Sequence, residues 1–133
     1  MKVIVCLDDN QGMLFNNRRQ SRDRKVIEDI CTMTEKLWIS PFSAKLLEGG
    51  GLCVCADESY LEMAGNGDYC FVEADPLEPH LHKIEEVIIY WWNRKYPTDT
   101  HLDLNLQEWV LKEQCDFAGF SHEKITKAVY VRR

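Results

Sequence analysis

The sequence predicts an α/β fold with a mostly parallel central sheet, short flanking helices and an antiparallel edge at the C-terminus. Three observations predict it. Short apolar runs with the near-continuous composition of buried strands alternate with segments of helical periodicity. Hydrophobic residues make up 45% of the chain, enough for a real core. Because the 133 residues contain no internal repeat or linker, we expect one domain spanning residues 1–133.

The first predicted unit is a strand, a loop and a helix. Residues 2–7 form a nearly continuous apolar run, as a strand covered on both faces does. Residues 8–21 are polar and predict a loop. Apolar residues at spacings of three and four predict a helix over 22–35, with Ser21 as its N-cap.

A second strand and a second, shorter helix follow. Residues 37–40 predict the strand. Ser40 is the expected cap of the helix and Pro41 its first residue, where the missing N–H does no harm. Gly49-Gly50-Gly51 is expected to end this helix. A third strand is predicted over residues 52–56.

Strands dominate the rest of the chain. They are expected over residues 69–73, 86–92, 101–106 and 125–132. Short helical turns are expected over residues 57–64 and 80–84, whereas 108–120 fits neither pattern. The apolar run in 86–92 is the expected centre of the sheet, and its two tryptophans, Trp91 and Trp92, are expected to point to opposite faces.

Charge and targeting signals exclude several classes of protein. The net charge of −6 argues against general affinity for nucleic acid or for anionic membranes. No apolar run approaches the ~20 residues of a membrane span. The N-terminal apolar stretch is shorter than that of a signal peptide. We therefore expect a cytoplasmic protein with neither a nucleic-acid partner nor a membrane partner.

The cysteines do not predict a metal or disulfide framework. They are Cys6, Cys31, Cys53, Cys55, Cys70 and Cys115. No Cys-x-x-Cys pair occurs, so the spacings match no zinc site. A chain of this size with a good core needs no disulfides, so we expect reduced and mostly buried thiols, and no metal.

The strongest functional feature is a basic cluster. Residues 18–25 hold five cations and one acid, a local charge of +4 in a chain of −6. Arginine forms planar, bidentate contacts with phosphate or carboxylate, and the predicted helix begins inside this cluster. A small anionic ligand is therefore expected. The alternative is a solvated cluster paired with nearby acids. The candidate ligand-binding residues are Arg18, Arg19, Arg22, Asp23, Asn93 and Arg94.

The last two of these residues follow the strand predicted over 86–92. In open α/β sheets, ligands favour the carboxyl ends of the strands. If Arg18 or Arg22 converges there with Arg94, that place is the expected site.

Three weaker patterns suggest hydrolytic or metal chemistry. His80 and His82 share a face on a strand but lie in a proline-bounded connector, where surface histidines are expected. Ser121-His122-Glu123 contains catalytic residue types, but members of a triad converge in space and are not sequence neighbours. Asp9 and Asp23 form a candidate carboxylate pair for acid–base work.

In plan the chain resembles dihydrofolate reductase. The resemblance rests on the apolar strand over 2–7, on Asp9 and Gly12 in the loop that follows, and on the closing strand over 122–133 with its basic pair. Asp23 falls near the family's substrate-binding acid, allowing a one-residue gap. The resemblance spans nearly the whole chain. It implies a dihydrofolate reductase-like fold and, in the family itself, NADPH-dependent reduction.

Two departures set this chain apart from that family, apart from its short length. Residues 37–43 lack the Gly-Arg-x-Thr-Trp motif. Where the family has a Gly-Gly pair that lets the backbone approach the cofactor pyrophosphate, this chain has Trp91-Trp92-Asn93. The expectation is therefore a degenerate, shortened domain with no cofactor and with reductase activity lost.

Three segments are also similar to a group of small Firmicute proteins, which implies a bacterial source. They are Arg18-Arg19-Gln20-Ser21-Arg22-Asp23-Arg24, Trp92-Asn93-Arg94-Lys95-Tyr96-Pro97 and Phe120-Ser121-His122-Glu123-Lys124-Ile125-Thr126. Some of those proteins carry the label ribonuclease Z, which requires His-x-His-x-Asp-His. The nearest match, over residues 80–85, lacks the Asp and the third His, so the residues do not support the label.

Three functional hypotheses follow, and whether the protein is an enzyme stays open among them. The first is an anion-binding domain without reductase chemistry. The second is a non-enzymatic interaction module, a homodimer or a partner-binding protein, that uses tryptophans and the basic loop. The third is a hydrolase or nuclease using Asp9, Asp23 or His122.

Overall fold

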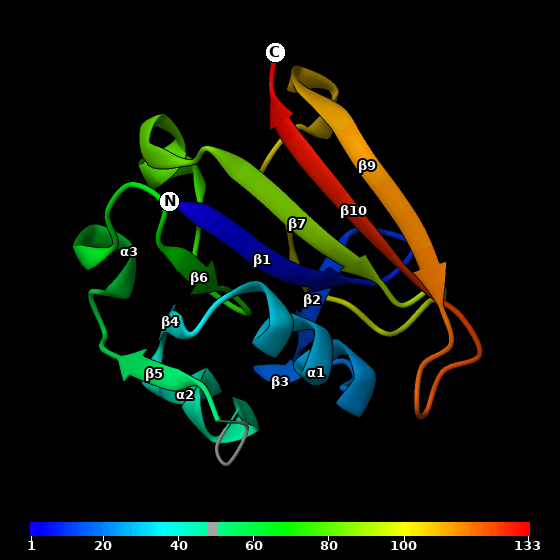
Figure 1. The fold of residues 1–133 in the computed structure, drawn as a ribbon. Helices are drawn as coiled ribbons and strands as arrows, with labels where there is room; N and C mark the ends of the chain where they lie inside the picture. The colour runs from blue at the N-terminus through cyan, green and yellow to red at the C-terminus, as the bar shows by residue number, and fades with distance from the viewer. Residues whose placement is uncertain (48–50) are drawn as a thin grey trace.

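A seven-stranded sheet organises the molecule, and the predicted α/β fold class is confirmed (Figure 1). The computed structural model describes residues 1–47 and 51–133. The strand order is β5-β4-β6-β1-β7-β10-β9. In chain order the strands are β1 (Lys2–Leu7), β4 (Lys36–Ile39), β5 (Cys53–Ala56), β6 (Tyr69–Phe71), β7 (Glu86–Trp91), β9 (Trp109–Phe117) and β10 (Ile125–Arg132).

The sheet is parallel from β5 to β7 and antiparallel at its C-terminal edge. β1 pairs in parallel with β6 and β7, and β4 pairs in parallel with β5 and β6. β10 lies antiparallel to both β7 and β9. The centre is β1, so the expectation that the run over 86–92 is central is wrong by one strand. Only two strands, β10 and β9, lie beyond β7, whereas four strands lie on its other side.

Short helices connect these strands. They are α1 (Arg24–Met33), α2 (Pro41–Ala44) and α3 (Tyr60–Met63), with 3-10 turns η1 (Lys45–Leu47), η2 (Glu78–Lys83) and η3 (Leu106–Glu108). α2 begins as expected, with Ser40 as cap and Pro41 in its first turn. Gly49 and Gly50, which were expected to end it, lie outside the described residues.

α1 begins two residues later than predicted. Its N-cap is Asp23, whose carboxylate accepts a hydrogen bond from Lys25 N at 2.9 Å. Ser21, the predicted cap, instead places its hydroxyl 2.9 Å from His122 Nε2. A local rule selects Ser or Asp equally well as a cap. Here Asp23 directly precedes the helix and accepts from Lys25 N, whereas the Ser21 hydroxyl faces His122.

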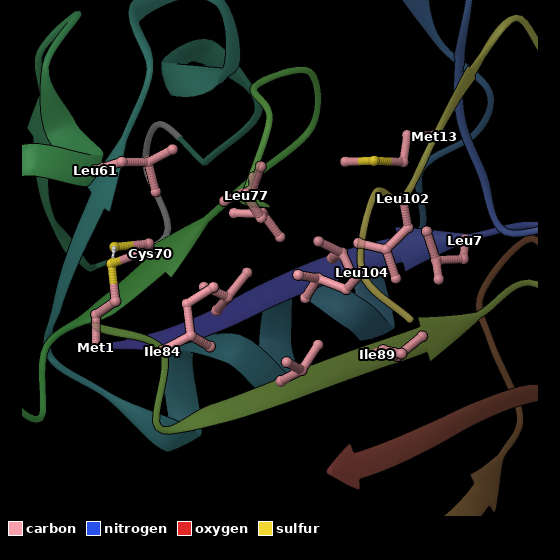
Figure 2. Close-up of a cluster of buried hydrophobic side chains, with 14 of the residues drawn as sticks. Met1, Leu7, Met13, Leu61, Cys70, Leu77, Ile84, Ile89, Leu102 and Leu104 are labelled. Atoms are coloured by element: carbon pink, nitrogen blue, oxygen red, sulfur yellow. Dashed lines mark hydrogen bonds between the residues drawn. The ribbon is translucent and has the colours of Figure 1, made fainter. Parts of the chain in front are cut away.

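Each face of the sheet carries its own hydrophobic core. One core gathers Met1, Leu7, Met13, Leu61 and other side chains from β1, β7, α3 and the 102–104 segment, as Figure 2 shows. The other packs α1 and the strands that it covers. Trp91 packs against the first core and Trp92 is buried in the second, so the predicted division of the two tryptophans between faces is confirmed.

The predicted polar loop over 8–21 contains a hairpin. β2 (Gly12–Phe15) pairs antiparallel with β3 (Arg18–Arg19), and β8 (Thr100–His101) completes a three-stranded sheet. Asn16 and Asn17 make the turn with φ values of 52° and 59°. Two consecutive residues with positive φ define a turn that suits hairpins, and asparagine tolerates it. This asparagine pair was the available signal for the hairpin.

Three other expectations need correction. The strand predicted over 101–106 ends at His101, because Leu102 and Leu104 turn into the core from irregular chain. The ambiguous segment 108–120 contains the long edge strand β9. The cysteines are not mostly buried: Cys70 is buried, but Cys53 and Cys115 lie exposed on the two edge strands. No helix in the described part of the chain has the length and apolar character needed to cross a membrane.

Candidate functional site

Three loops meet beyond the carboxyl ends of β1 and β7 (Figure 1). They are residues 8–23, residues 92–98 and the β9–β10 connection over 118–124. Asp9 N donates to Arg94 O at 2.9 Å, which joins the first two loops. Phe120 N donates to the Asp23 carboxylate at 2.8 Å, which joins the first and third. The candidate site is therefore built from segments about a hundred residues apart.

Asp23 is the electrostatic centre of this region. Its side chain is fully buried and accepts hydrogen bonds at 2.8–2.9 Å from three backbone N–H groups, those of Lys25, Phe120 and Ser121. Nδ1 of His122 lies 2.8 Å from its Oδ2. Burial raises the pKa of Asp23, but these hydrogen bonds outweigh burial and lower the pKa to about 2. The carboxylate is therefore ionised and fully occupied by protein donors.

His122 extends this network outward. Its side chain is 3% exposed, and its ring stacks on Trp92 with centroids 4.6 Å apart and planes at 20°. Nε2 lies 2.9 Å from Ser21 Oγ and 3.2 Å from the hydroxyl of Tyr96. The two ring nitrogens thus join a buried carboxylate to two hydroxyl groups.

A second buried carboxylate, Asp8, holds the loops together. It accepts hydrogen bonds from the N–H groups of Asn10, Gly12 and Tyr96 at 2.9, 2.7 and 3.1 Å, and from the Thr98 hydroxyl at 3.0 Å. Burial raises the pKa of Asp8, and the hydrogen bonds more than offset it, so the net shift is downward.

Sequence reasoning selected the neighbouring Asp9 instead of Asp8, but Asp9 is exposed. The available signal was that Asp8 directly follows a strand buried on both faces. Position 12 also requires glycine for a steric reason, since a Cβ there would clash with the side chain of Thr98.

Arg19 forms an ion pair with Glu73. Its Nε and a terminal nitrogen each lie 2.7 Å from an oxygen of Glu73, which is a bidentate ion pair. Its guanidinium also lies 5.5 Å from the ring centroid of Phe42. Of the predicted basic cluster, Arg19 therefore fits the alternative of pairing with nearby acids.

Within the described part of the chain, three hollows border the network. One of about 310 Å³ lies at the start of α1, and Asp23, Arg24, Phe120 and Ser121 are among its lining residues. A groove of about 550 Å³ lies between the β2–β3 hairpin and the 93–97 loop, and Arg18, Arg19, Gln20 and Tyr96 are among its lining residues. A cavity of about 20 Å³ lies between α1 and the sheet. Ser21, Arg22, Asp23, Cys6, Glu73 and Trp92 are among its lining residues.

The six predicted ligand-binding residues do not form one cluster. Arg18 and Arg19 line the groove, whereas Arg22 and Asp23 line the cavity. Asn93 has a φ of 59° and donates to Lys124 O and to the Thr126 hydroxyl, so it fastens the loop to β10. Arg94 is exposed and lines none of these hollows. Sequence reasoning missed Gln20 and Tyr96 as groove residues and Ser21 and His122 as a pair.

A bulky side chain follows the end of β7. Trp92 is buried, and its indole stacks on His122. In the described residues, no three His, Cys, Asp or Glu side chains gather in a way that could hold a metal ion. His80 lies 3.9 Å from Glu62 on the surface, away from this network.

Comparison with solved structures defines the fold. The chain is similar to dihydrofolate reductase from Enterococcus faecalis, solved in complex with NADP(H) and RAB-propyl, with a TM-score of 0.69 and 7% sequence identity. The match covers 99% of this chain and 95% of that one. The fold is therefore dihydrofolate reductase-like, as the sequence resemblance implied. No protein-family model matches the sequence, and no curated protein matches it.

Proposed function

We propose that the protein binds a small anionic ligand in the groove beside Arg18 and does not catalyse NADPH-dependent reduction. The observation that carries the proposal is the placement of Arg18. It is exposed on the wall of a groove of about 550 Å³, and no acid within the described residues forms an ion pair with it. Ligand pockets commonly measure about 300–1,000 Å³.

The other groove residues suit such a ligand. Phe15 and Tyr96 supply aromatic surface, and Asn16 and Gln20 supply amide groups. A guanidinium beside aromatic walls binds phosphate or carboxylate groups through paired N–H donors. In a chain with a net charge of −6, an unpaired arginine in a concave site is a local reversal of charge.

Two features support the loss of reductase chemistry. The cavity between Asp23 and the sheet measures about 20 Å³, the room of a single water, so a bicyclic pterin does not fit there. The hollow of about 310 Å³ that Asp23 also lines is walled by Arg24, Phe120 and Ser121 and, among the described residues, by no strand of the sheet. The carboxylate that would face such a ring is already occupied by four donors of the protein. Trp91-Trp92-Asn93 stands where the resemblance to dihydrofolate reductase implies a glycine pair.

Thermal unfolding in the presence of inorganic phosphate, pyrophosphate, AMP, NADPH and dihydrofolate tests the proposal. A ligand at a hundred times its Kd stabilises the native state by about 2.7 kcal/mol, which raises the midpoint. We expect a shift with at least one phosphate compound, abolished by Arg18→Ala and retained in the matched surface variant Lys45→Ala. Oxidation of NADPH with dihydrofolate, or no shift with any anion, would contradict the proposal.

A second candidate function is self-association through β9. This strand lies at one end of the sheet order, and seven of its nine residues are exposed, including Val110 at 39% and Leu111 at 46%. An exposed edge strand pairs readily with another. Antiparallel pairing centred between Lys112 and Glu113 would set Lys112 of one copy opposite Glu113 of the other. Sedimentation equilibrium tests it, and a monomer at all concentrations would contradict it.

A further inference from the structure

A serine, a histidine and an aspartate line up at the start of α1. Ser21 Oγ lies 2.9 Å from His122 Nε2, and His122 Nδ1 lies 2.8 Å from Asp23 Oδ2. The histidine comes from the β9–β10 connection, and the other two residues precede α1. These are the contacts and the order of a nucleophile, its base and the acid that orients the base.

The surroundings of Asp23 fix which nitrogen of His122 carries its proton. The carboxylate accepts hydrogen bonds from the N–H groups of Lys25, Phe120 and Ser121, and it has no proton of its own to give. The contact at 2.8 Å therefore requires Nδ1–H as donor. The lone pair of the neutral ring then lies on Nε2, toward the Ser21 hydroxyl. This is the tautomer in which the histidine can take a proton from the serine.

The ring is also held in place. Trp92 stacks on it with planes at 20°, and its side chain is only 3% exposed. A base held in this way loses no alignment when the serine reacts.

Ser21 is more exposed to solvent than His122. It is half-buried and lines the cavity shared with Arg22, Cys6 and Glu73. Arg22 is exposed and lines the same cavity, so a cation is available near the serine to a carbonyl oxygen on which negative charge develops. With a volume of about 20 Å³, the cavity beside Ser21 leaves no room for a bulky acyl group.

Tyr96 connects this relay to the larger groove. Its hydroxyl lies 3.2 Å from His122 Nε2, and its side chain lines the groove that holds Arg18. Nε2 therefore stands between a small cavity and a groove of ligand size. An ester whose acyl part is small and whose alcohol part extends outward matches this division.

We propose that Ser21 is a nucleophile, activated by His122 and oriented through Asp23, that accepts a small acyl group from an ester. Ser21 Oγ bonds to the carbonyl carbon while its proton passes to His122 Nε2. The carbon–oxygen bond to the alcohol breaks, and the alcohol leaves with that proton. Water then attacks the acyl–serine ester, gives a proton to Nε2 and releases the acid, and Ser21 regains its proton. The net reaction is ester plus water to acid plus alcohol. It does not depend on anion binding by Arg18.

A fluorophosphonate probe tests the nucleophile directly. It reacts with an activated serine by displacement of fluoride, and intact-mass spectrometry with peptide mapping locates the adduct. We expect one adduct per chain at Ser21, absent in Ser21→Ala and retained in Ser59→Ala, a variant of the exposed serine that precedes α3. Tyr96→Phe removes the competing hydroxyl and is expected to label at least as fast as the wild type. An unlabelled but folded wild-type protein, or an adduct at another serine, overturns the proposal.

The orienting role of Asp23 is tested by a separate variant and by NMR of the His122 ring. In Asp23→Asn an amide can face His122 with its oxygen or its NH₂, and the NH₂ form favours the other histidine tautomer. We expect labelling to slow by about a hundredfold or more, as in other relays with a neutralised acid. Nitrogen NMR of the wild-type ring, which needs no variant to fold, is expected to show a protonated Nδ1 and an unprotonated Nε2. The reverse pattern overturns the proposal.

Discussion

Removal of the Asp23 carboxylate is expected to destabilise the protein strongly. In Asp23→Ala, the buried Nδ1 of His122 and the partly buried N–H groups of Lys25, Phe120 and Ser121 all lose their acceptor. Breaking a buried charged network of this kind costs about 3–5 kcal/mol. The same change removes the N-cap of α1, whose loss alone costs about 1 kcal/mol.

The expected loss depends on pH with a definite sign. The ordinary pKa of 3.8 describes the unfolded chain, and the folded pKa is about 2. Because the folded state holds this proton more weakly, the charge contributes stability at pH values above 3.8 and loses it as the pH falls toward 2. The difference between these two pKa values corresponds to about 2 kcal/mol of stability.

Urea unfolding followed by tryptophan fluorescence measures both quantities, since Trp92 stacks on His122 within the network. We expect Asp23→Ala to differ from the wild type by about 3–5 kcal/mol at pH 7, and the difference to shrink by about 2 kcal/mol near pH 2. Asp9→Ala is the matched control at an exposed acid. A difference below about 1 kcal/mol at pH 7, or one that does not change with pH, would refute the reasoning.

Three further results are expected. Asp8→Ala leaves one buried and three partly buried donors without an acceptor and should lower the free energy of unfolding by about 3 kcal/mol, measured by urea titration. Gly12→Ala should destabilise by about 1–3 kcal/mol because its Cβ meets Thr98, and a neutral result in thermal unfolding would contradict the close approach. A double-mutant cycle on Arg19 and Glu73 should give a favourable coupling of about 1 kcal/mol or more, and additivity would show that the bidentate pair does not form in solution.

Much of the fold was predictable because apolar runs carry it. The strand over 2–7 and the run over 86–92 are buried on both faces, and their sequences show it without any knowledge of neighbours. Such apolar runs do not predict the order of the strands in the sheet. β1 lies at the centre because β10 and β9 extend the sheet beyond β7. This order depends on pairing between strands that are far apart in the sequence.

The candidate site was harder to predict, for a physical reason. Its contacts join residues far apart in sequence, such as Ser21 and His122, which are separated by 101 positions. The resemblance to dihydrofolate reductase pointed to Asp23, whereas His122 was considered only with its immediate neighbours. Arginine clusters look uniform in sequence. Only the structure separates Arg19, neutralised by Glu73, from Arg18, which has no acid partner among the described residues.

The position at which a small anion binds tests the central claim most directly. Chemical-shift mapping on the labelled protein, with pyrophosphate and with dihydrofolate added separately, gives that position. The proposed function predicts that pyrophosphate perturbs Arg18, Gln20 and Tyr96 around the groove and that dihydrofolate leaves Asp23 and His122 unchanged. Perturbation of Asp23 and His122 by dihydrofolate, with the groove silent toward pyrophosphate, would contradict it.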